Sequence, residues 1–202
     1  YQGASQSRAL AGLEGQATAR WSVNDLGASL GLGFLGQEGR TEGHAWRLSR
    51  LRASAAWINP WTPLALRAEL GRLDGEPSSL DRFHLGGQPT SLLPTGLDAN
   101  RVAQAALPAF SATGNRFQRL RVETGAPLLF YAERTQLWDA GLPKPEAQRV
   151  MGLELESQRM GLPLEVARRL LGNVSFTLGL HRPLDGIMKG RTVGTISFLV
   201  RP

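Results

Sequence analysis

The chain has 202 residues, of which 42% are hydrophobic and 20% charged, and it contains no cysteine. This composition excludes an intrinsically disordered chain, and the lack of cysteine excludes disulfides, thiolate metal sites and cysteine nucleophiles. The formal net charge is +6, but the arginines are spread through apolar segments, whereas nucleic-acid binding requires a basic patch or stripe. No apolar run reaches the roughly 18 residues that would indicate a transmembrane helix. The chain begins at Tyr1 without an initiator Met or a signal peptide, which indicates a processed or truncated start.

The first two predicted elements are strands with a strict two-residue alternation. In residues 13–23 the odd positions are apolar or small and the even positions are polar, without exception. Residues 26–34 alternate in the same way, and Asn24-Asp25 between them suits a tight hairpin turn because both residue types tolerate positive φ. Such alternation is typical of strands that separate two different environments. Residues 37–43 are polar and rich in glycine, and a loop is predicted there.

The third predicted strand, residues 46–57, changes phase in its middle. Trp46 and Leu48 share one face, whereas the apolar residues from Leu51 onward have the opposite parity. A β-bulge near Ser49-Arg50 would bring both sets to one face, and it is predicted on that ground.

The later elements are further strands, two long loops and one helix. Pro163 at a first-turn position and Gly172 as a stop favour a short helix over residues 163–171. Long loops are expected over residues 86–115 and 138–149. The additional strands, which bring the total to about ten, are expected at residues 64–73, 82–85, 117–124, 128–138, 149–157, 173–181 and 191–201.

The alternation alone fits either a soluble β-barrel or a transmembrane one, and three features favour the membrane. Several segments reach the roughly 9–11 residues that a tilted membrane strand needs, where soluble strands usually have about 5–6. Short connections alternate with longer ones, as at the two ends of a membrane barrel. Charged residues in mid-strand are predicted to face a polar lumen, since lipid would penalise them: Arg20, Arg67, Glu69, Arg119, Arg121, Glu123, Glu154 and Glu156. Aromatic residues near segment ends are predicted to form a girdle at the lipid interface: Trp21, Phe34, Trp46, Trp57 and Trp61.

Three later phrases resemble outer-membrane assembly-factor barrels of the surface-antigen superfamily. RFHLGGQ at residues 82–88 is similar to the phrase that ends a strand before a long loop in that family. LFYA at residues 129–132 with Trp138 is similar to a second phrase, and residues 178–202 resemble the family's final hairpin. The resemblance covers about the last 120 residues and implies the C-terminal part of an outer-membrane barrel. The ending also looks like barrels fused behind TolB-like propeller domains, in which the barrel acts mainly as an anchor.

The sequence differs from this family at one motif that is linked to activity. Members with assembly or secretion activity usually carry a Val-Arg-Gly-aromatic motif in the long loop, whose Arg reaches into the lumen. Residues 88–94 read QPTSLLP and lack this Arg-Gly pair. The resemblance therefore does not extend to insertase or secretion activity.

The remaining motifs that could indicate another function are better explained as parts of β-strands. Residues 31–36 match G-x-G-x-x-G, but no helix or βαβ unit is expected around them. The three histidines lack metal-ligand spacing, and Ser29 lacks the G-x-S-x-G setting of a nucleophile. Glu154 and Glu156 share one strand face, where charge pairing is favoured over acid–base catalysis.

The prediction is an all-β chain, an antiparallel transmembrane β-barrel formed by residues 1–202 or the C-terminal portion of a larger one. Its expected role is that of an outer-membrane anchor, pore or assembly platform, without enzymatic activity, catalytic residue, cofactor or metal. The expected partners are outer-membrane lipid and lipopolysaccharide and a periplasmic or upstream domain, with no nucleic acid. Two alternatives stay open: a soluble β-barrel that binds an apolar ligand, and an outer-membrane barrel enzyme.

Overall fold

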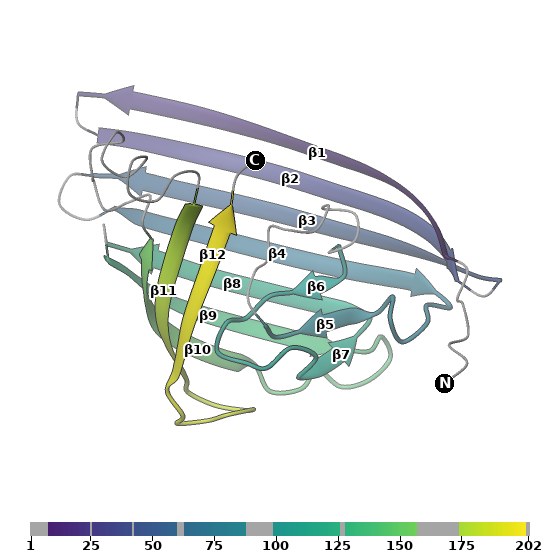
Figure 1. The fold of residues 1–202 in the computed structure, drawn as a ribbon. Coiled ribbons are helices and arrows are strands. Elements are labelled where there is room, and N and C mark those ends of the chain that lie inside the picture. Colours follow the sequence, from purple (N-terminus) through teal and green to yellow (C-terminus); the bar gives the residue numbers. More distant parts are fainter. Residues whose placement is uncertain are drawn as a thin grey trace.

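The computed structural model describes residues 8–24, 26–41, 43–59, 63–87, 99–125, 128–156 and 174–200. These residues form an all-β fold with two sheets, one of nine strands and one of three (Figure 1). No helix in this part of the chain is long and apolar enough to cross a membrane. The helix expected at residues 163–171 lies outside the described residues.

The large sheet is antiparallel throughout, and its strands follow chain order except where the small sheet is inserted between β4 and β8. Its strands are β1 (Arg8–Val23), β2 (Leu26–Thr41), β3 (His44–Ile58), β4 (Leu64–Gly75), β8 (Arg116–Thr124), β9 (Leu128–Trp138), β10 (Gln148–Glu156), β11 (Val174–Pro183) and β12 (Val193–Val200). The sheet is strongly curved, and in Figure 1 β11 and β12 turn across the front of the other strands. β1 and β12 are its two edges, and no pairing joins them among the described residues. The ten expected strands are all present, nine of them in this sheet.

The connection from β4 to β8, residues 76–115, is called the insert. It contains β5 (Phe83–Leu85), β6 (Arg101–Val102) and β7 (Ala112–Gly114), with β5 paired to β6 in parallel and to β7 in antiparallel orientation. The loop expected at residues 86–115 therefore contains two short strands, while residues 88–98 lie outside the described part.

Alternation gives the large sheet two different faces. The outer face exposes large apolar side chains from one edge of the sheet to the other, for example Leu13 (72% exposed), Leu32 (63%) and Ile196 (63%). The opposite face, here called the inner face, carries the insert. The main hydrophobic core lies between the insert and the inner face, where Phe83 packs edge-on against Phe117 with ring centroids 4.8 Å apart. The large apolar surface of the outer face is not part of this core.

Two expectations about β2 and β3 are wrong. The pairing of β2 with β3 is continuous through Ser49 and Arg50, so there is no bulge. Trp46, Leu48 and Arg50 instead share the inner face, which is apolar only where the insert covers it. Residues 37–41 belong to β2 and are not a loop. Polar side chains fit both faces of the strand there: Thr41 on the inner face donates to Asp81 at 2.8 Å, and Glu38 on the outer face pairs with Arg47.

Candidate functional site: a charged inner wall covered by the insert

Paired charges run across the inner face from β1 to β10. Five arginines and five glutamates take part, so this network has no net charge. Its members are Glu14, Arg50, Arg52, Arg67, Glu69, Arg119, Arg121, Glu123, Glu133 and Glu154. Two-residue alternation places these side chains on one face, and the strand register sets opposite charges beside each other on neighbouring strands. Each charge of the network has an oppositely charged partner in the wall.

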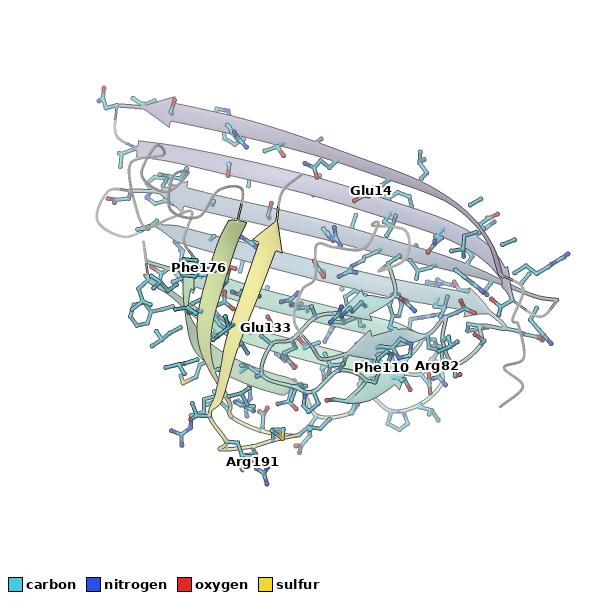
Figure 2. All side chains as sticks on the ribbon, in the orientation of Figure 1. Glu14, Arg82, Phe110, Glu133, Phe176 and Arg191 are labelled. Carbon is cyan, nitrogen blue, oxygen red and sulfur yellow. The ribbon has the colours of Figure 1, made fainter. Side chains whose placement is uncertain are left out.

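Arg121 on β8 is the centre of this network. Its guanidinium reaches Glu123 at 2.7 Å, Glu133 at 3.6 Å and Glu154 at 2.6 Å, and its Cζ atom lies 3.8 Å from the Tyr131 ring centroid. One arginine thereby links three neighbouring strands, β8, β9 and β10. Glu133, labelled in Figure 2, is only 2% exposed at its side chain.

A hydrogen-bonded relay of neutral side chains continues the wall toward β12. The Tyr131 hydroxyl lies 2.6 Å from His181 Nδ1, and His181 Nε2 lies 2.7 Å from the Thr195 hydroxyl. His181 is buried, and both its ring nitrogens are engaged, so the relay supports the wall and leaves no ring nitrogen open for a ligand.

Hydrogen bonds from Arg50 and Gln104 tie the insert to this wall. Arg50 Nη1 donates to the carbonyl oxygens of Ala99 (3.3 Å) and Arg101 (2.9 Å) in the insert. Gln104 Nε2 donates to Glu133 Oε1 at 3.0 Å. Arg50 and Gln104 are both buried, so these bonds join the insert to the sheet in a region shielded from water.

The predicted lumen-facing charges all occupy inner-face positions by register. Six of them join the paired network: Arg67, Glu69, Arg119, Arg121, Glu123 and Glu154. Arg20 lies opposite Ser29 on that face but forms no ion pair with any described residue. Glu156 pairs in register with Thr177 on the same face, and its side chain is outside the described part.

The predicted aromatic girdle is only partly compatible with the structure. Trp21, Phe34 and Trp57 are half exposed on the outer face, and register places Trp21 and Trp57 in one row, on either side of Ala28. Trp46 was predicted to be a girdle residue, and this is wrong. It is 3% exposed on the inner face and donates from its indole nitrogen to Thr41. Trp61 lies outside the described residues.

Four members of the network were not among the predicted lumen-facing charges: Glu14, Arg50, Arg52 and Glu133. The two arginines have the parity of Trp46 and Leu48, and the supposed bulge concealed this. Glu133 alternates with the outward-facing Phe130 and Ala132, so its inward position could have been read from β9.

The described residues bring together no constellation for catalysis or metal binding. No group of three or more potential metal ligands occurs among them. Ser29, the candidate nucleophile that was considered, has no hydrogen bond to a histidine of the described part. The G-x-G-x-x-G segment at residues 31–36 lies inside β2, far from the strand–turn–helix setting of a nucleotide site.

Comparison with known proteins does not identify the chain. It matches no protein-family model, and no curated protein matches its sequence. The function must therefore be argued from the two faces of the sheet and from the insert.

Proposed function

We propose that the nine-stranded sheet is the wall of a transmembrane β-barrel in the outer membrane of a Gram-negative-type cell, and that the barrel serves as a membrane anchor. The observation that carries this proposal is the reversed polarity of the sheet, with apolar side chains exposed outside and paired charges inside. A soluble barrel has the opposite arrangement, with its apolar residues enclosed.

The energetics of the outer face support lipid as its environment. Burying a Leu, Val or Phe side chain is worth roughly 1.5–3 kcal/mol, so a water-exposed band of such residues over nine strands forgoes a large stabilisation. Monomeric soluble proteins rarely expose contiguous apolar patches beyond a few hundred Å². In a membrane the same band is solvated by acyl chains.

The dimensions of the band also fit. The outward positions of β1 that carry large apolar side chains lie between Leu13 and Val23. At about 3.3 Å per residue and a tilt near 40°, that segment rises about 25 Å, which matches the apolar band of outer-membrane barrels. β1 and β12 are the edges at which the wall closes in this proposal, by pairing with each other or with further strands.

The insert favours an anchor over an open pore. It shares a hydrophobic core with the inner face and is tied to the wall through Arg50 and Gln104. The paired network is neutral, so it offers a permeating ion no net charge. The lack of the Val-Arg-Gly-aromatic motif argues against an assembly activity and so also favours an anchor.

A folding assay separates the anchor from the soluble binding module. The chain is unfolded in urea and diluted into buffer alone or into buffer with phospholipid vesicles, and β structure and protease resistance are then measured. The expected result is protease-resistant β structure only with vesicles. A soluble, monomeric, protease-resistant protein in buffer alone would refute the proposal.

Planar-bilayer recording separates the anchor from the pore. The expected record for the inserted protein is free of sustained conductance steps, because the insert packs against the inner side of the wall. Stable, long-lived open steps would instead favour a pore.

A further inference from the structure

The outer face over β8–β11 contains an apolar groove. Its volume is about 500 Å³, and its outward lining includes Val122, Phe130, Met151 and Leu180. Register explains the hollow, since the small Ala132 lies in one row between Val122 and Met151. A depression on an otherwise bulky apolar surface is suited to a flexible hydrocarbon chain.

A polar hollow continues this groove toward the end of the sheet that carries the insert. It has a volume of about 470 Å³ and is lined in part by Arg134, Gln136, Glu146 and Arg149. Arg134 and Arg149 are paired in register, two residues beyond the Ala132–Met151 row on the same face. The two hollows together make an amphipathic site on one surface.

Two guanidinium groups at this site have no carboxylate partner among the residues that the structure describes. Arg149 is bound to Asp185, whereas Arg134 donates a long hydrogen bond of 3.4 Å to the neutral Gln136. Arg182 lies beside Met151 in register, is exposed, and has no ion pair within the described part of the chain. Sheet spacing puts the Cα atoms of Arg134 and Arg182 about 12 Å apart, a separation that two arginine side chains can span around one phosphate. Lys189 and Arg191 on the adjoining loop are exposed and raise the positive charge further.

We propose that this surface binds a phosphorylated, multiply acylated lipid of the lipid A type, with one acyl chain in the groove and a phosphate between Arg134 and Arg182. This inference rests on the proposed membrane location. Guanidinium groups bind phosphate in bidentate geometry, and an acyl chain gains by filling an apolar hollow.

The connections of the sheet favour the outer leaflet, where lipid A resides. The end with the arginines carries the insert, the connections at residues 139–147 and 184–192 and one short connection at 42–43, while the short connections at 24–25, 59–63 and 125–127 lie at the other end. Longer loops are typical of the external side of outer-membrane barrels. Residues 157–173 are the one long connection at the opposite end.

The test is native mass spectrometry of the full chain folded in detergent, with lipid A, phosphatidylglycerol or phosphatidylcholine added. The charge variant is Arg134→Gln with Arg182→Gln. Its matched control is Arg47→Gln with Arg72→Gln, which removes two outer-face arginines already paired with Glu38 and Asp74. The groove variant is Ala132→Trp, and its control is Ala55→Trp, an outer-face position away from the groove.

We expect lipid A to be retained in preference to the other two lipids, and the charge variant to weaken its retention roughly tenfold or more. Ala132→Trp should weaken retention too, while both controls stay near the parent chain. Equal retention of all three lipids, preference for phosphatidylglycerol, or equal loss in variant and control would overturn the lipid A assignment. These results would leave the membrane proposal intact, since that proposal fails only if the chain folds as a soluble protein without lipid.

Discussion

The guanidinium of Arg50 and the carboxylate of Glu69 lie 2.7 Å apart on the inner face, where both side chains are largely buried. The same guanidinium holds the insert through the carbonyl oxygen of Arg101. This pair therefore links two adjacent strands and the segment that covers them.

Removing one member of this pair should destabilise the fold strongly. Arg50→Met leaves Glu69 buried with a weaker partner, Arg52 at 3.3 Å, and should lower the free energy of unfolding by about 3 kcal/mol. The control Arg47→Met breaks an exposed pair with Glu38 and should cost less than about 1 kcal/mol. Equilibrium urea unfolding in vesicles measures both, and equal losses would contradict the role given to Arg50.

The double variant Arg50→Met, Glu69→Met extends this test. A buried pair replaced by apolar side chains of similar volume is often neutral, so the double variant should be more stable than Arg50→Met alone. A double variant that is less stable than either single variant would show that the pair is not coupled as described.

A close approach between Gly71 and Phe117 predicts a steric effect. The Phe117 ring lies over Gly71 on the neighbouring strand, in the space that a Cβ atom would need. Gly71→Ala should therefore cost about 1–3 kcal/mol through displacement of the ring. The control Gly15→Ala, on β1, meets nothing within 4 Å and should leave the free energy of unfolding unchanged or raise it. Adding Phe117→Leu to Gly71→Ala should recover part of the loss, and no recovery would place the strain elsewhere.

In the strands with uninterrupted alternation both the strand and its two faces were predictable from sequence, whereas in β3, which contacts the insert, the strand was predictable and its inner-face residues were not. Residues 13–23 and 26–34 separate two environments along their whole length, so their pattern predicts both strand and face. At Trp46 and Leu48 the inner environment itself becomes apolar, because insert residues some 40 positions away pack there. The local sequence pattern does not contain that information, so the change of phase was interpreted as a bulge.

The types of residue in the candidate site were predictable from the sequence, but their ion-pair partners were not. Mid-strand charges on one face followed from parity, but the partners of Arg121 on β9 and β10 depend on strand register. The strands β6 and β7 have two and three residues, too few for any period to be visible. They exist because β5 provides an edge for both of them to pair with.

A lipid-facing band predicts that an arginine costs more stability in the middle of the band than near the membrane interface. Leu66→Arg, in the middle of the apolar band, should cost about 2–4 kcal/mol in a bilayer, whereas an arginine near the interface should cost about 0–1 kcal/mol. Gln118→Arg, on the same face and opposite Leu70 at the edge of the band, provides the interfacial control. Reversible unfolding in vesicles measures both. Near-equal effects within about 0.5 kcal/mol, as at ordinary water-exposed sites, would contradict a lipid-facing band.

The loop between β11 and β12 predicts a pH effect. Partial burial opposes ionisation of Asp185, but the hydrogen bonds that it accepts from the backbone N–H and guanidinium of Arg149 outweigh this and lower its pKa. A carboxyl whose pKa is lower in the folded state stabilises that state above the unfolded pKa of about 4, and the stabilisation is lost as the pH falls through the folded value.

Asp185→Asn should therefore be less stable than the parent chain at neutral pH, by less than about 1 kcal/mol because Arg149 is exposed. The difference should shrink as the pH falls below about 4. Unfolding curves at several pH values measure it, and a constant difference across that range would exclude the ion pair as its cause.

The most direct test of the membrane account is the environment of single side chains on the two faces of the sheet. The chain has no cysteine, so single cysteines for a fluorescent label can be placed at Leu32 and Leu66 on the outer face and at Thr18 and Ser54 on the inner face. The protein is folded into vesicles with or without lipids brominated along their acyl chains. The account predicts strong quenching at Leu32→Cys and Leu66→Cys and little at Thr18→Cys and Ser54→Cys. Equal quenching on both faces, or quenching confined to the inner positions, would contradict it.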